Sequence, residues 1–171
     1  IIDTTGTVAI NTSTVNISGF TFRKVLVNGN ITLTSNINAT TFGTWGTSSI
    51  SFVLGGNTLN FTHLELGNSA TTTLPFAWVC QNIEFVNTSS GVLTGNSITI
   101  NGNILQSGGS TYSGTTTFTY AGTGTWNSTS TGYFSNSFTI NTAGTLTFIS
   151  ANIGGGIFTY TAGTVITTGS T

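Results

Sequence analysis

Apolar and polar residues alternate in short segments that return at nearly constant spacing along the chain. The clearest copies are apolar-Thr-apolar triplets, each beginning 20 residues after the previous one. These triplets are Ile98-Thr99-Ile100, Phe118-Thr119-Tyr120, Phe138-Thr139-Ile140 and Phe158-Thr159-Tyr160. Self-similarity at a fixed period of about 20 to 50 residues is the signature of a repeat protein, so the pattern favours a solenoid.

Each triplet is typical of a strand that buries its first and third residues and exposes the second. If successive copies pair in parallel, equivalent positions stack at about 4.8 Å. The predicted inner column includes Ile17, Phe61, Trp78, Ile100, Phe118, Phe138, Ile140 and Phe158. The predicted outward ladder comprises Asn16, Asn38, Asn60, Thr99, Thr119, Thr139 and Thr159, with Val79 between its Asn and Thr parts.

The repeat continues towards the N-terminus with looser spacing. The segment LNFTHLEL aligns with WVCQNIEF at an offset of 19, and earlier triplets begin at Ile37 and Val15. A second apolar segment follows each triplet, and Gly, Ser and Asn clusters lie between the copies as turn signals. We therefore expect one domain over residues 1–171 with about eight rungs, spaced by about 22 residues in 1–66 and about 20 in 78–171.

Composition agrees with an all-β fold. Thr, Ser, Asn and Gly make up 99 of the 171 residues, whereas Asp, Glu, Lys and Arg together number five. Good helix formers are scarce, and β-branched and aromatic residues that fit a pleated surface are abundant. The prediction is a parallel β-solenoid, taken as right-handed because parallel crossovers are nearly always so. A β-sandwich or jelly roll is the alternative, although it has no reason to keep one residue type in one column.

The charge excludes some partners. With a net charge of −1 and two basic residues, the chain cannot neutralise a phosphate backbone, so we expect no nucleic-acid partner. No apolar run approaches the roughly 20 residues of a membrane span, so we expect no membrane insertion. The lone Cys80 has no partner for an intramolecular disulfide and lies among large apolar residues, which predicts a buried structural thiol.

Candidate chemistry centres on His63, Glu65 and Glu84. The alignment of rungs places the two carboxylates about 5 Å apart, a separation compatible with a retaining glycosidase or a weak cation site. The alternative is a pair of solvated surface acids. Arg23 and Lys24 are expected too many rungs away to complete a polysaccharide-cleaving site, and act more simply as edge charges.

Other catalytic and metal motifs are missing from the sequence. A Ser-His-acid triad fails because His63 is the single histidine and there is no Gly-x-Ser-x-Gly elbow. Clusters of His and Cys for a metal site are also missing. We therefore expect neither an enzyme nor a bound cofactor or metal. Ice-binding solenoids carry two neighbouring columns of Thr, whereas the repeat here predicts a single Thr column. The pattern therefore does not favour ice binding.

Two tryptophans are candidate stacking platforms for sugars. Trp45 and Trp126 occur in the similar contexts FGTWGTSS and TGTWNSTS, where either burial in the core or exposure to a glycan fits the pattern, with burial favoured. Together with His63, Glu65 and Glu84, they form the set of candidate cation or glycan contacts.

Neither end of the sequence shows the polar cap that soluble solenoids carry. We therefore expect the chain to be part of a longer fibre, or to assemble through its ends into a homopolymer.

The stretches NSITINGNILQSGG, TFTYAGTGTWNSTSTG and IFTYTAGTVITTGST resemble Thr/Gly/Asn-rich β-solenoid repeats of phage and viral fibre proteins and of filamentous-haemagglutinin-like adhesins. The resemblance is compositional and covers about residues 90–171 best. It implies a non-enzymatic structural or adhesive fibre element that is extracellular, on a cell surface or a virion, with surface glycans as a further candidate partner.

Overall fold

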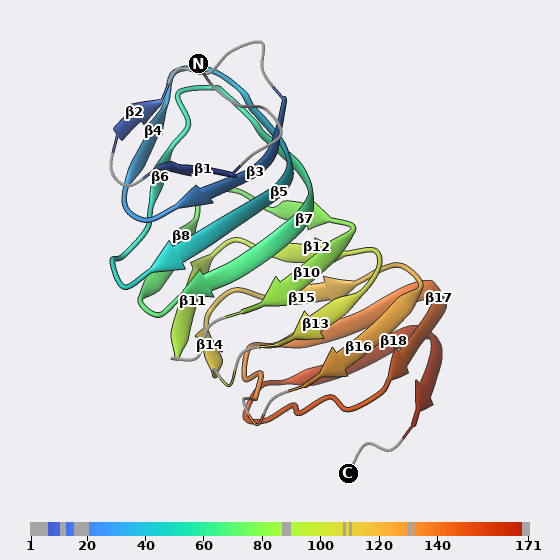
Figure 1. Ribbon diagram of the computed structural model, residues 1–171. Helices are drawn as coiled ribbons and strands as arrows, with labels where there is room; N and C mark the ends of the chain where they lie inside the picture. The colour runs from blue at the N-terminus through green and yellow to red at the C-terminus, as the bar shows by residue number, and fades with distance from the viewer. Residues whose placement is uncertain are drawn as a thin grey trace.

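The computed structural model describes residues 7–10, 13–15, 21–86, 90–107, 109, 111–129, 131 and 133–168. The chain is an all-β parallel solenoid of about seven turns with a period near 21 residues, which confirms the predicted fold class. The turns stack along one axis from the N-terminus to the C-terminus (Figure 1). Every strand pairing in the described part of the chain is parallel, which excludes the alternative of an antiparallel β-sandwich.

Each turn contributes strands to three faces. The triplet face carries the apolar-Thr-apolar segments, the second face carries the apolar segments that follow them, and a third face closes the cross-section. Long strands bend from the triplet face onto the second face, which joins both faces into one 12-stranded sheet. These long strands are β3 (Thr21–Val27), β5 (Ile37–Gly46), β7 (Leu59–Asn68), β17 (Phe138–Phe148) and β18 (Phe158–Thr167).

The remaining strands each lie on a single face. On the triplet face they are β9 (Trp78–Cys80), β12 (Ile98–Ile100) and β15 (Phe118–Tyr120). On the second face they are β1 (Thr7–Ile10), β10 (Asn82–Phe85), β13 (Ile104–Gln106) and β16 (Gly124–Ser128). On the third face they are β2 (Ser13–Val15), β4 (Ile31–Leu33), β6 (Phe52–Val53), β8 (Thr71–Leu74), β11 (Gly91–Gly95) and β14 (Tyr112–Gly114).

The predicted register of the triplet face is confirmed from β9 to β18. Thr99 pairs with Val79 and Thr119, Thr119 pairs with Thr139, and Thr139 pairs with Thr159. Earlier in the chain, Asn38 pairs with Asn60 as expected. The outward ladder therefore exists over two Asn and four Thr positions, because parallel pairing at a constant offset keeps equivalent residues in one column.

The predicted register of the first rung is wrong. Val15 lies in β2 on the third face, where it pairs with Leu33. The residue that pairs with Asn38 is Thr21, at an offset of 17 and not 22. Asn16 and Ile17, which were assigned to this rung, lie outside the described residues. The solenoid has about seven turns, and not the eight predicted.

Aromatic and aliphatic side chains fill the interior. Trp78, Phe118, Phe138 and Ile140 are fully buried, as the predicted inner column requires, and so is Ile100. Phe61 is only partly buried at the edge of this core. Phe158 keeps the expected register and stacks on Phe138 with ring centroids 5.9 Å apart. It is nonetheless 42% exposed, because β18 is covered by a described strand on one side only.

On the third face, one large side chain lies opposite a glycine. Tyr112 pairs with Gly91. The ring lies against Phe85, with centroids 4.9 Å apart, and its hydroxyl donates to the carbonyl oxygen of Leu66 at 2.6 Å. A buried phenol that makes a hydrogen bond avoids the cost of an unsatisfied polar group.

Substituting Phe138 by Asp should prevent folding, because the change places an unpaired charge among aromatic rings at a fully buried position. The control is Thr139→Asp, whose side chain points outward in the same triplet. Circular dichroism and thermal unfolding should show a folded control and an unfolded Phe138→Asp chain. A Phe138→Asp protein with an unchanged spectrum and melting temperature would contradict the core assignment.

Candidate functional site

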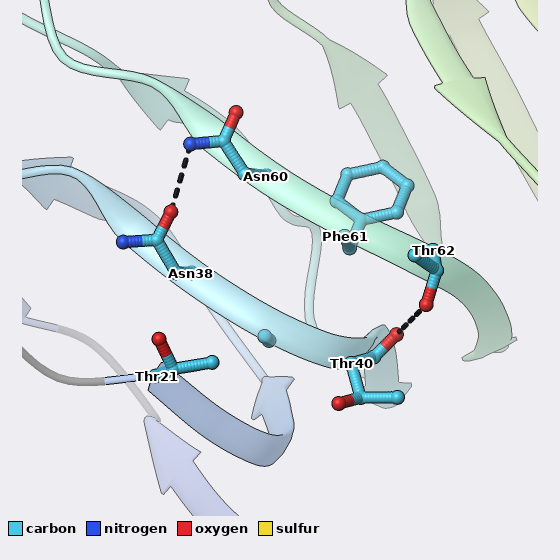
Figure 2. Close-up of a pocket in the computed structure, with 7 residues that line it drawn as sticks. Thr21, Asn38, Thr40, Asn60, Phe61 and Thr62 are labelled. Carbon is cyan, nitrogen blue, oxygen red and sulfur yellow. Dashed lines mark hydrogen bonds between the residues drawn. The ribbon is translucent and has the colours of Figure 1, made fainter.

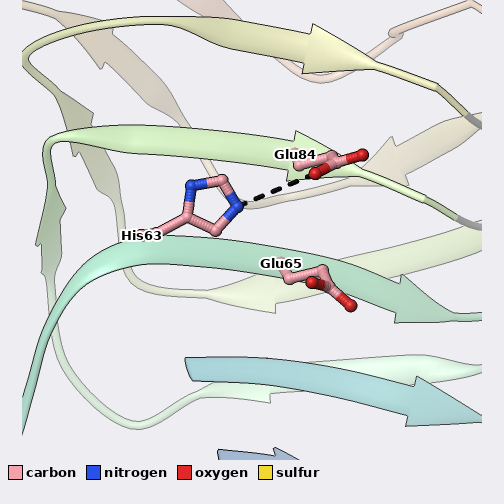
Figure 3. A group of neighbouring side chains, drawn as sticks. All are labelled: His63, Glu65 and Glu84. Atoms are coloured by element: carbon pink, nitrogen blue, oxygen red, sulfur yellow. Dashed lines mark ion pairs between the residues drawn. The ribbon is translucent and has the colours of Figure 1, made fainter. Parts of the chain in front are cut away.

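Nearly all of the charged side chains that the structure describes gather on the outer surface of the second face. His63 and Glu65 are outward residues of β7, and Glu84 is the counterpart of Glu65 in β10 (Figure 3). One ligand atom of each of these three residues lies within 4.8 Å of the others. The predicted closeness of the two carboxylates is therefore confirmed. We call His63, Glu65, Glu84 and Lys24 the charged cluster.

Lys24 belongs to this cluster, against expectation. Its Nζ atom lies 2.6 Å from Oε2 of Glu65, although the two residues are 41 positions apart. Lys24 lies two turns before β7, and the short offset between β3 and β5 puts it in one outer column with Thr41 and His63. Gly43 lies between Leu26 and Glu65 in the same sheet, and an added Cβ there would lie 2.7 Å from Cδ2 of Leu26 and 3.1 Å from Cβ of Glu65.

The rest of the cluster is held more loosely. Nε2 of His63 lies 3.8 Å from Oε2 of Glu84, which is beyond hydrogen-bond distance. The other oxygen of Glu84 accepts a hydrogen bond from the Ser107 hydroxyl at 2.7 Å. Only 9% of Glu65 is exposed, whereas the side chains of His63 and Lys24 are about a quarter exposed. The result is a half-buried group of two carboxylates, one imidazole and one ammonium.

This geometry favours ion binding over glycoside hydrolysis. The carboxylates are near the roughly 5 Å separation of retaining glycosidases. In such an enzyme one carboxylate attacks the sugar, but Oε2 of Glu65 is already paired with Lys24 and the side chain is almost buried. A groove in the described part of the structure lies elsewhere, on the triplet face.

That groove is shallow and open, with a volume of about 370 Å³ (Figure 2). Two rows of outward polar side chains form its walls, and Ala39 and Phe61 form its floor. Much of the polar surface is already used, since Nδ2 of Asn60 donates to Oδ1 of Asn38 at 2.8 Å and the Thr62 hydroxyl donates to the Thr40 carbonyl at 3.0 Å. The amide ladder thus joins neighbouring turns.

The two candidate tryptophans have different surroundings. Trp126 is inward, 1% exposed and packed on Phe138, so it offers no face to a ligand and is corrected to a core residue. Trp45 is outward and 53% exposed. It lies against Gly67 of the next turn, where an added Cβ would be 3.0 Å from the indole ring. The favoured burial is thus confirmed for Trp126 and wrong for Trp45.

Comparisons with known proteins identify no family or relative and so add nothing to the fold described above. No protein-family model matches the chain, and neither a curated protein nor a solved structure matches it. The part of the chain that the structure describes has no helix long and apolar enough to cross a membrane. The function therefore has to be argued from the charged cluster, Trp45 and the ends of the described solenoid.

Cys80 is buried, as the sequence predicts, and burial raises the pKa of its thiol from 9.0 to about 12. We expect the folded protein to react very slowly with a thiol reagent such as DTNB at mildly alkaline pH, because the thiolate is the nucleophile. Reaction should be complete in concentrated guanidinium chloride, as measured by absorbance. Rapid stoichiometric reaction of the folded protein would contradict the burial.

The same shift predicts alkaline destabilisation. The folded pKa lies above the unfolded one, so the contribution of the thiol to stability is fully present below about pH 9 and is lost as the pH rises towards about 12. Tyr120, whose pKa burial also raises to about 12, acts in the same direction. Chemical denaturation across this range should show a smaller loss for Cys80→Val than for the unmodified chain. An equal loss in both proteins would contradict the role of the thiol.

Proposed function

We propose that this protein is a non-enzymatic structural element of an extracellular fibre on a cell or virion surface, and that copies assemble through the ends of the solenoid. The observation that carries the proposal is the last described turn. In β18, the positions that are buried in β17 are exposed to solvent, and its outer edge has no described strand beside it.

The exposed surface of β18 is both apolar and unpaired. Its large apolar residues are each at least 39% exposed, namely Phe158, Tyr160, Val165 and Ile166. Their partners in β17 are either fully buried or, in the case of Thr147, on the outside. An unpaired strand edge with apolar neighbours is a template for another strand, which soluble proteins normally cover. A further parallel turn that paired with β18 would extend the hydrogen-bond ladder. It would also bury the aromatic side chains of Phe158 and Tyr160.

The outer surface fits a structural role. Thr and Asn side chains that bond within or between turns cover the ladders, as in the pairs Asn60–Asn38 and Thr73–Thr94. Such a surface has little net charge and is held by short-range contacts in every turn. The resemblance of residues 90–171 to viral fibre and adhesin repeats supports the extracellular location, and the scarcity of basic residues argues against a nucleic-acid partner.

Negative-stain electron microscopy and sedimentation across a concentration series test the assembly. The unmodified chain should form filaments with an axial repeat of about 34 Å, from about seven turns at about 4.8 Å each. Phe158→Asp should abolish the filaments and leave a folded monomer, because this residue is already 42% exposed. Thr159→Asp, in the same strand but facing outward, is the control and should still assemble. Discrete monomers of the unmodified chain at every concentration would refute end-to-end assembly.

Glycan binding is a second candidate, which the exposed Trp45 favours. Its indole ring, the adjacent Gly67 and the polar groups of the charged cluster lie on one outer surface of the second face. An exposed aromatic ring can stack on the apolar face of a sugar while neighbouring polar groups bind hydroxyls.

A glycan array followed by calorimetry on any hit tests this second candidate. Trp45→Ala should weaken binding by at least about tenfold, which corresponds to about 1.4 kcal/mol. The control is Val53→Ala, another exposed apolar residue that lies on the third face. Equal binding by both variants would exclude Trp45 as the platform.

A further inference from the structure

We infer that the charged cluster is a binding site for a borderline divalent transition metal of the Zn²⁺ class, with His63, Glu65 and Glu84 as the protein ligands. Imidazole nitrogen and carboxylate oxygen together suit Zn²⁺ and its neighbours, whereas Ca²⁺ and Mg²⁺ take oxygen ligands alone. This site does not depend on assembly through the ends of the solenoid, and it does not involve Trp45.

The distances fit one metal ion with modest side-chain movement. The three ligand atoms all lie within 4.8 Å of one another, and the His63–Glu84 pair is 3.8 Å apart. Bonds of about 2.0 to 2.2 Å to a tetrahedral ion place ligand atoms roughly 3.3 to 3.6 Å apart. Small side-chain rotations cover this difference, since β7 and β10 hold the backbone in fixed register. Three protein ligands leave the fourth position open to water.

The hydrogen bonding of the cluster leaves ligand atoms available to a metal ion. His63 makes no hydrogen bond in the described structure, its side chain is 28% exposed, and its Nε2 is directed towards Glu84 (Figure 3). Glu65 is about nine-tenths buried, yet only one of its oxygens has a described partner, the ammonium of Lys24. The Ser107 hydroxyl donates to the far oxygen of Glu84, and such hydrogen bonds orient carboxylates that bind metal ions.

The charge balance also favours a cation. With the imidazole neutral, Lys24 offsets one glutamate and leaves the cluster with a charge of −1. Lys24 is a competitor for Glu65 and not a ligand, because an ammonium group has donors only. A metal ion that binds Glu65 must therefore share this carboxylate with Lys24 or displace the lysine, whose side chain is 28% exposed and can move into solvent.

This competition gives a test that separates a metal site from a surface ion-pair network. Isothermal titration of the tag-free chain with ZnCl₂ at neutral pH should show one ion bound per chain. His63→Asn and Glu84→Gln should each weaken binding by more than about tenfold, because each removes a ligand. Lys24→Met should instead tighten binding several-fold, since it frees the paired oxygen of Glu65.

The matched control is Thr41→Ser, which lies beside His63 in the same outer column and should bind Zn²⁺ as the unmodified chain does. Circular dichroism of each variant checks that the solenoid is folded. A titration with CaCl₂ should give no saturable binding. The proposal is overturned if the unmodified chain binds no Zn²⁺, if His63→Asn and Glu84→Gln bind it unchanged, or if Ca²⁺ binds more tightly than Zn²⁺.

Discussion

The structure depends on parallel pairing of each segment with its counterpart one turn later. This pairing puts equivalent positions in columns about 4.8 Å apart, so a residue that suits one turn has to suit its neighbours. The inward column of the triplet face is apolar in consecutive turns, as Phe118 and Phe138 show, and an outward column must consist of side chains that tolerate close stacking. Thr and Asn meet this demand because they are small, uncharged and able to bond to the next copy.

Charges are rare in such a column because like charges in consecutive turns repel. Glu65 and Glu84 break this rule, being partners in adjacent turns. The structure compensates on both sides, with Lys24 on one carboxylate and Ser107 on the other. The charged cluster therefore differs from the rest of the outer surface, where Thr and Asn predominate. This difference is the reason for treating it as a candidate site.

Features that depend on a constant residue offset between turns were predicted from the sequence. Features that depend on a change in this offset were missed. The 19-residue offset was sufficient to bring Glu65 beside Glu84. The ion pair with Lys24 was missed because the offset between β3 and β5 drops to 17 residues, a change that no motif marks. The third face was missed because its strands are only two to five residues long. Trp45 and Trp126 share a local motif but differ in the phase of strand alternation, which depends on the register and not on the motif.

The hydroxyl of Tyr112 contacts the carbonyl of Leu66 across an intervening turn, 46 residues earlier in the chain. In a simple repeat rod each turn touches only its neighbours, so the rod can unravel from an end one turn at a time. A contact that skips a turn couples the opening of three consecutive turns, and Lys24–Glu65 does the same nearer the N-terminus. If the molecule is pulled along its axis, the three turns joined by such a contact should therefore open together and not one at a time. The contacts Tyr112–Leu66 and Lys24–Glu65 define these groups of turns.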